Sequence, residues 1–167
     1  GLFFSLVSTS LIASDKLDTN SYYFFIKHFV FIILGITILI VFSILKEELL
    51  FKVSIILFVI FFITLVLVPF IGIEIKGSKR WLEMGFLPRF QPIEIIKPFF
   101  IITVSTLLCL NKNNLYIKYL LSSFILLPNL LLLISQPDLG QTLLIAMIWL
   151  TLIFVSGINV YLFFLFF

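Results

Sequence analysis

The feature that most constrains this chain is a series of long apolar segments separated by short polar ones. Of its 167 residues 62% are hydrophobic and only 11% are charged, which is more apolar than the surface of a soluble domain permits. Because about 20 apolar residues cross the roughly 30 Å hydrocarbon core of a bilayer, runs of this length predict membrane-spanning helices. Strands of a membrane barrel would alternate apolar and polar residues, and these runs do not. The predicted fold class is therefore all-α, a polytopic transmembrane helix bundle.

The sequence predicts one partial transmembrane domain over residues 1–167. Complete spans are expected at residues 28–45, 53–73, 93–110, 119–134 and 139–156. Residues 1–13 and 159–167 are apolar but too short to cross a bilayer, so we expect both terminal spans to be incomplete. The main hydrophilic connection is residues 74–92.

The charges of this connection leave the membrane orientation open on residue grounds. Its cations, set against Glu74 and Glu83, are Lys76, Lys79, Arg80 and Arg89. The positive-inside rule weakly favours a cytoplasmic loop on the side of Lys16 and Lys27, leaving opposite them Lys46, Lys52, Lys112 and Lys118. An external loop would instead suit an anionic ligand, because Arg and Lys bind phosphate oxygens through charge-assisted hydrogen bonds. Trp81 fits either an interfacial anchor or a ring that contacts sugar or lipid.

Two short motifs beside the spans contain further charged side chains. In Gln91-Pro92-Ile93-Glu94-Ile95-Ile96-Lys97, Pro92 and Glu94 suit a first helical turn. Glu94 and Lys97 are three residues apart and can form an ion pair, structural or functional, on one helix face. In Ser135-Gln136-Pro137-Asp138-Leu139-Gly140-Gln141, Asp138 is placed either to cap the following helix or to contact a cation or the basic loop.

Composition excludes several classes of site and partner. His28 and Cys109 are the only histidine and cysteine, so the sequence offers no His or Cys metal cluster, no Ser-His-Asp set and no internal disulfide. Cys109 is expected to be a small buried residue. A net charge of +3 in so apolar a chain gives no reason to expect nucleic acid as a partner.

Three linked motifs resemble those of the SEDS family, which includes FtsW, RodA and a sporulation homologue. They are, in the family's order and spacing, Gly77-Ser78-Lys79-Arg80-Trp81, Gln91 to Lys97, and Gln136-Pro137-Asp138-Leu139-Gly140. Leu6-Val7-Ser8-Thr9-Ser10 also resembles the family's first helix, and Lys76-Gly77 resembles FtsW more than RodA. Departures from the family pattern are Ile93, Pro98 and Gln141.

The resemblance covers essentially the whole chain and implies a protein of ten transmembrane helices. This chain would hold the N-terminal part, six helices and a fraction, incomplete at both ends. The basic loop and the Gln-Pro-Asp turn would both be periplasmic, in a multi-pass protein of the bacterial inner membrane at the division site.

The activity that the resemblance implies is polymerisation of lipid II, an undecaprenyl-pyrophosphate-linked disaccharide pentapeptide, by a peptidoglycan glycosyltransferase. Its implied partners are a class B penicillin-binding protein and other divisome membrane proteins. The family's general base, an Asp in a His-Thr-Asp-Phe setting, has no counterpart in this sequence, so we expect no catalytic residue here and an inactive fragment. The implied substrate-binding residues are Arg80, Trp81, Lys79, Gln91, Glu94, Lys97 and Asp138. No metal ligand is implied, and the cofactor prediction is limited to a divalent cation, magnesium or manganese, accompanying the pyrophosphate.

Two other functions would use the same residues. A lipid II flippase would need the basic loop and the charges of the cavity but not the later Asp. A non-catalytic scaffold of the division complex, or the remnant of a broken gene, would need only a surface for its partner. The sequence alone does not separate these from the polymerase.

Overall fold

The structure, a computed structural model, describes residues 23–75, 77–83, 89–109 and 114–157. The expected terminal spans 1–13 and 159–167, the segment from Leu6 to Ser10, and Lys76 lie outside the described residues. The chain divides into two compact units, Gly1–Glu47 and Glu48–Phe167, which are described separately below.

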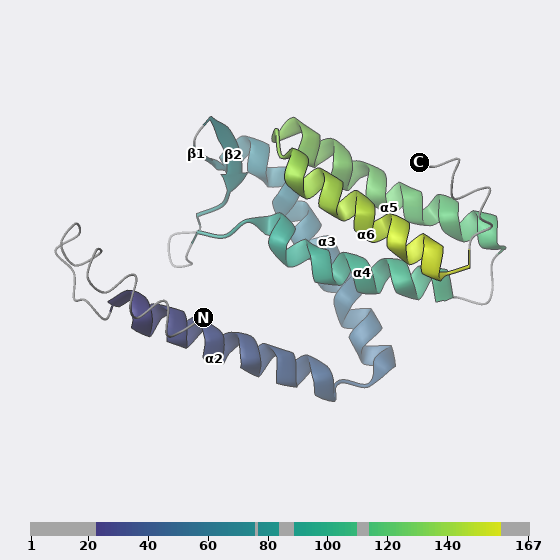
Figure 1. Ribbon diagram of the computed structural model, residues 1–167, viewed down its shortest axis with the longest axis horizontal. Coiled ribbons are helices and arrows are strands. Elements are labelled where there is room, and N and C mark those ends of the chain that lie inside the picture. Colours follow the sequence, from purple (N-terminus) through teal and green to yellow (C-terminus); the bar gives the residue numbers. More distant parts are fainter. Residues whose placement is uncertain (1–22, 76, 84–88, 110–113, 158–167) are drawn as a thin grey trace. The chain divides into compact units, whose positions relative to one another are not determined.

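The described part of the chain is helical apart from one small pair of strands, which confirms the predicted fold class (Figure 1). The first unit contains helix α2, Tyr23–Ile44. The other helices are α3 (Glu47–Ile71), α4 (Pro92–Cys109), α5 (Leu115–Ser135) and α6 (Leu139–Val155). Among the described residues, α2, α3, α4 and α5 are long and apolar enough to cross a membrane, whereas α6 has 17 residues. Helix α3 begins before the expected residue 53 because Glu47 and Glu48 suit the first turn of a helix.

A β-hairpin, which the sequence did not predict, lies within the connection 74–92. Strand β1 (Ile73–Ile75) pairs antiparallel with β2 (Ser78–Trp81), and an isolated bridge joins Leu82 to Phe90. Gly77 directly precedes β2, and its φ of +79° is a conformation that favours glycine. Strands of three and four residues are too short to show an alternating pattern, so the sequence could not reveal them.

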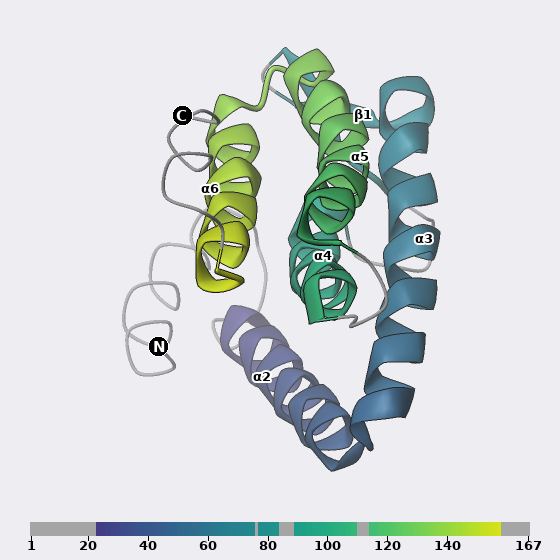
Figure 2. The ribbon, with the colours of Figure 1, turned by 90° about the vertical axis from the view of Figure 1, so that its right-hand side faces the viewer.

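Helices α4, α5 and α6 pack against one another, and α3 lies along the other side of α4 and α5 (Figure 2). Buried side chains recur at helical spacing, as in Ile96, Phe100 and Val104 of α4. Helix α3 joins this core through aromatic contacts, with the Phe58 and Phe100 ring centroids 6.2 Å apart. The core therefore contains side chains from α3, α4, α5 and α6.

Several buried polar side chains of the bundle find partners within it, whereas Ser54 Oγ and Thr103 Oγ1 have no hydrogen-bond partner among the described residues. The indole nitrogen of Trp149 in α6 donates to Ser122 Oγ in α5 at 3.1 Å. The buried ammonium of Lys118 donates to the backbone oxygen of Leu108 at 2.9 Å, where the α4 dipole favours a cation. Cys109, the last residue of α4, is exposed, so the expectation of a buried cysteine is wrong. In the last turn of α4 the neighbouring Leu108, rather than Cys109, is buried in the core.

We expect Phe100→Ala to lower the free energy of unfolding by about 3 kcal/mol, because it leaves a cavity between α3 and α4. The measurement is thermal unfolding of the purified protein in detergent. Phe124→Ala is the matched control, since Phe124 is 65% exposed on α5 and its removal opens no cavity. Equal losses for the two variants would contradict the packing of α3 on α4.

Candidate functional site

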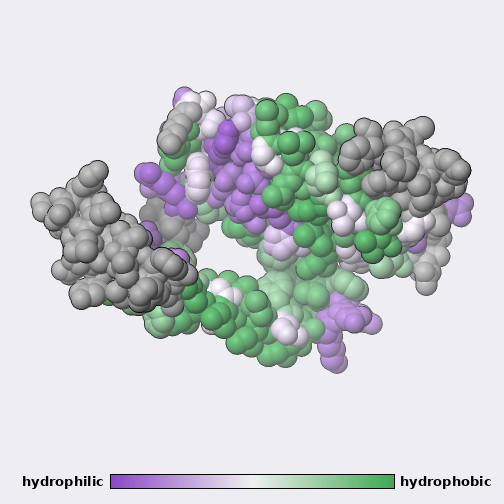
Figure 3. Space-filling model, viewed as in Figure 1, coloured by the Kyte–Doolittle hydropathy of each residue, from purple (hydrophilic) through white to green (hydrophobic). Residues whose placement is uncertain are grey.

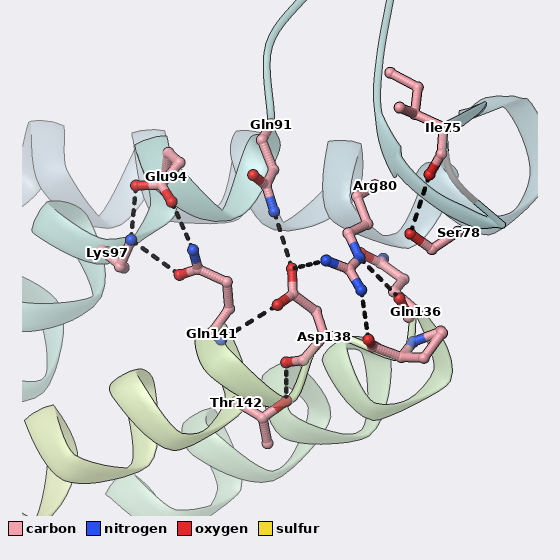
Figure 4. A network of polar contacts seen from close by, with 11 residues as sticks. Ile75, Ser78, Arg80, Gln91, Glu94, Lys97, Gln136, Asp138, Gln141 and Thr142 are labelled. Carbon is pink, nitrogen blue, oxygen red and sulfur yellow. Dashed lines mark hydrogen bonds and ion pairs between the residues drawn. The ribbon is translucent and has the colours of Figure 1, made fainter.

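Hydrophilic side chains of the second unit gather where the hairpin meets the ends of α4, α5 and α6, beside largely apolar helix surfaces (Figure 3). Figure 4 shows that these side chains come from segments far apart in the sequence and point toward one another. The predicted motifs therefore meet in space, as a network that begins at Asp138.

Asp138 is 7% exposed and connects three segments of the chain. Its Oδ1 accepts a hydrogen bond from the backbone N–H of Gln141 at 3.3 Å, which makes Asp138 the N-cap of α6. Its Oδ2 accepts from Gln91 Nε2 at 3.1 Å and lies 3.6 Å from the guanidinium of Arg80. The two alternatives for Asp138, helix cap and partner of a cation in the basic loop, are thus both realised.

Arg80 fastens the hairpin to the Gln-Pro-Asp turn, residues 136–138. Its guanidinium donates from Nε to the backbone oxygen of Gln136 at 3.2 Å and from a terminal nitrogen to that of Pro137 at 2.5 Å. With Asp138 beside it, the planar fork of the Arg80 side chain meets both the end of α5 and the start of α6. A lysine in its place would supply a point charge without this fork.

A second cluster lies on the first turns of α4 and α6. The Glu94 carboxylate and the Lys97 ammonium form the predicted ion pair, with Oε2 and Nζ 2.6 Å apart. The Gln141 side chain joins both residues, donating from Nε2 to Glu94 Oε1 at 2.7 Å and accepting from Lys97 Nζ at 3.0 Å. The neighbouring Pro98 does not remove Lys97 from this cluster.

Lys79 and Trp81 lie at the edge of the network rather than in it. Lys79 is exposed and lines a hollow of about 280 Å³ together with residues of the hairpin and of the Gln-Pro-Asp turn. Trp81 is half-buried and pairs with Ile73 in the strand register. Of the seven predicted substrate-binding residues, the structure brings together Arg80, Gln91, Glu94, Lys97 and Asp138.

Sequence reasoning left several members of this network without a role, among them Gln136, Pro137 and Gln141. Gln136 accepts from Arg80 through its backbone oxygen, a role that no side-chain pattern reveals. Gln141 was noted only as a departure from the family pattern, yet it connects the two clusters through its backbone and its side chain. The available signal was a glutamine in the first turn of an apolar helix, three residues after an N-cap Asp.

The described residues contain no group of three or more His, Cys, Asp or Glu side chains that could hold a metal ion. Both carboxylates of the network already face a cation, Asp138 facing Arg80 and Glu94 facing Lys97. This donor set does not fit a protein-held divalent cation. It fits a compact, charge-balanced binding surface at the end of a helix bundle.

Spans of membrane length and a charged network at their ends define this chain as part of a multi-pass membrane protein with a polar site at one end of its helices. The sequence model of the cell cycle proteins FtsW, RodA and SpoVE matches residues 1–167. The chain belongs to this family, which confirms the resemblance drawn from the motifs.

Known relatives cover the chain almost completely, although the chain spans only about two fifths of their length. A protein of Coxiella burnetii named probable peptidoglycan glycosyltransferase FtsW is 30% identical over 161 residues, 93% of this chain and 43% of that protein. The protein of the same name from Buchnera aphidicola is 32% identical over 165 residues, 96% of this chain and 41% of that protein.

Solved structures share the fold. The crystal structure of the Thermus thermophilus rod shape determining protein RodA matches with a TM-score of 0.73 and 25% identity, over 99% of this chain and 56% of that one. A chain of a peptidoglycan synthase complex that coordinates polymerization and crosslinking matches with a TM-score of 0.67 and 26% identity, over 94% of this chain and 47% of that one.

We expect substitutions of Asp138 to separate its two roles. Asp138→Asn keeps an acceptor for the helix cap but removes the charge beside Arg80, and should cost about 1 kcal/mol. Asp138→Ala removes both and should cost about 2 kcal/mol or more. Thermal unfolding measures the cost, and hydrogen exchange of residues 78–81 reports release of the hairpin.

The control is Arg89→Ala, which breaks the exposed ion pair with Glu83 and should cost well under about 1 kcal/mol. If Asp138→Ala left the exchange of residues 78–81 unchanged, the fastening of the hairpin by this network would be refuted.

Proposed function

We propose that the whole protein to which this chain belongs is a peptidoglycan glycosyltransferase that polymerises lipid II at the division septum. The names of the relatives support this activity, since proteins called peptidoglycan glycosyltransferase FtsW match 93% and 96% of the chain. The observation that carries the proposal is the union of the family's charged motifs into one network at the end of the helices. The chain would supply part of the lipid II site.

The contacts of the seven predicted substrate-binding residues suggest a division of roles. Arg80, Gln91 and Asp138 bind one another or the adjoining turn, which suits residues that hold the site in shape. The exposed Lys79 and the half-buried Trp81 are available to a head group, a cation for phosphate and a ring for sugar. Glu94 and Lys97 combine the two roles, because they pair with each other and each is still partly exposed to a ligand.

Lys97 is the cation best suited to the pyrophosphate. An ammonium has three N–H donors, and the Lys97 ammonium uses two of them on Glu94 and Gln141. The third could bind an anionic oxygen of the substrate. Because the pyrophosphate leaves with added negative charge, a fixed cation beside it would stabilise the transition state of glycosyl transfer.

Deprotonation of the attacking sugar hydroxyl is assigned in this proposal to the family's later Asp, outside this chain. Glu94 and Asp138 are poor candidates for that base, because each already accepts hydrogen bonds or faces a cation. A divalent cation, if the reaction uses magnesium or manganese, would be bound by the pyrophosphate rather than by the described residues.

The partner proposed for the whole protein is a class B penicillin-binding protein, within a division complex. The likeness to a chain of a peptidoglycan synthase complex supports an assembly of this kind. The similarity to relatives named FtsW supports a place at the division site of the inner membrane.

We expect Lys97→Met to reduce lipid II polymerisation by the full-length protein about ten- to a hundredfold in kcat/KM, the effect of losing one charge-assisted hydrogen bond. The measurement is glycan chain formation from purified lipid II, resolved on gels, with the partner penicillin-binding protein present. Lys52→Met is the matched control, because Lys52 is an exposed lysine of α3 outside the network.

Three outcomes would count against the proposal. Equal activity of the Lys97→Met and Lys52→Met variants would remove Lys97 from the site. A wild-type protein that moves labelled lipid II across liposome membranes but makes no polymer would support the flippase, and one that does neither but retains its partner would support the scaffold.

A further inference from the structure

The Gln141 amide closes a ring with Glu94 and Lys97 (Figure 4). The ring consists of the ion pair at 2.6 Å, the Lys97 bond to Gln141 Oε1 at 3.0 Å and the Gln141 Nε2 bond to Glu94 Oε1 at 2.7 Å. Two of its members lie on α4 and the third on α6, so the ring also ties the first turns of these helices together.

Only a side chain with a donor and an acceptor on the same group can complete this ring. The amide of glutamine offers both, with a donor facing the carboxylate and an acceptor facing the ammonium. A carboxylate at position 141 would accept from Lys97 but repel Glu94. A hydrocarbon there would leave Lys97, whose side chain is 16% exposed, with one fewer acceptor in a partly desolvated place.

We propose that Gln141 is a positioning residue for the lipid II pyrophosphate, acting by holding the Lys97 ammonium in one orientation. Without Gln141, Lys97 could rotate about its flexible chain and follow the more exposed Glu94 toward solvent. With it, two N–H groups of Lys97 are occupied and the third is left for an anionic oxygen. The inference rests on the proposed function, because it takes lipid II as the ligand.

The backbone of Gln141 extends the effect to the other cluster. Its N–H donates to Asp138 Oδ1, and Asp138 lies beside Arg80 on the hairpin. Gln141 thus lies between the cap of α6 and the ion pair of α4. The orientation of Lys97, and with it the binding of its ligand, would therefore depend on the position of the hairpin as well.

The test exchanges the Glu94 and Gln141 side chains in the full-length protein. Gln141→Glu alone should weaken lipid II binding about five- to thirtyfold and lower Tm by about 2–4 °C, since two carboxylates then face each other. The double variant Glu94→Gln with Gln141→Glu restores one amide, one carboxylate and one ammonium, and should recover both values. The measurements are the Kd of lipid II, the kcat of polymerisation and Tm without lipid II.

A positioning role predicts that the single variant raises Kd more than it lowers kcat, because the pyrophosphate is anionic before transfer begins. Thr151→Val is the control, a polar-to-apolar change on the same helix but outside the network. The Thr151 hydroxyl donates to the Met147 backbone oxygen at 2.8 Å, and its loss should leave Kd unchanged.

The outcomes separate this inference from the proposed function. If the wild type binds and polymerises lipid II but Gln141→Glu leaves Kd unchanged, or the double variant is no better than the single one, the role of Gln141 is overturned and the polymerase stands. If the wild type binds lipid II without polymerising it, and Kd still rises in the single variant and recovers in the double variant, the positioning role of Gln141 is supported and the polymerase activity is rejected. If no lipid II binds, both are rejected.

Discussion

The network of polar side chains at the ends of α4, α5 and α6 depends on the contacts of one carboxylate, that of Asp138. It caps α6, accepts a hydrogen bond from the segment before α4 through Gln91, and lies beside the guanidinium that fastens the hairpin. Because the Asp138 carboxylate is almost fully buried, its negative charge must be balanced by hydrogen-bond donors or a cation in direct contact with it. The same compensation brings three segments together, so the position of each depends on the other two.

Charge balance explains how such a cluster is tolerated beside apolar spans. Ionisable groups near a bilayer are costly unless they pair with one another or with backbone groups. Here Arg80 bonds to two carbonyl oxygens as well as facing Asp138, and Lys97 pairs with both Glu94 and Gln141. Each cation is therefore matched before any ligand arrives, and the cluster serves both architecture and recognition.

The five complete spans predicted from the sequence overlap α2 to α6, because apolar length is a local signal, and the linked motifs are local signals as well. It could not predict which face of each helix is buried, since these helices are apolar all round, and the positions of Phe100 and Trp149 in the core depend on neighbouring helices. The hairpin was missed because its strands are too short to show a pattern. The Glu94 and Lys97 pair was predictable from spacing, whereas its closure by Gln141 is a long-range contact that requires the fold.

The direction of the helices does not by itself make this end of the bundle a site for anions. Helices α4 and α6 both begin here, as the contacts from Gln91 to Asp138 and from Gln141 to Glu94 require. Their N-termini carry partial positive charge, which Glu94 and Asp138 offset within the first turns. Arg80 and Lys97 then offset the two carboxylates, so the four side chains sum to no net charge, while the C-terminus of α5 brings partial negative charge to the same place, where Arg80 binds the oxygens of Gln136 and Pro137. An anionic head group approaching this end would therefore depend on the exposed Lys79 and on the remaining N–H of Lys97 rather than on the helix dipoles.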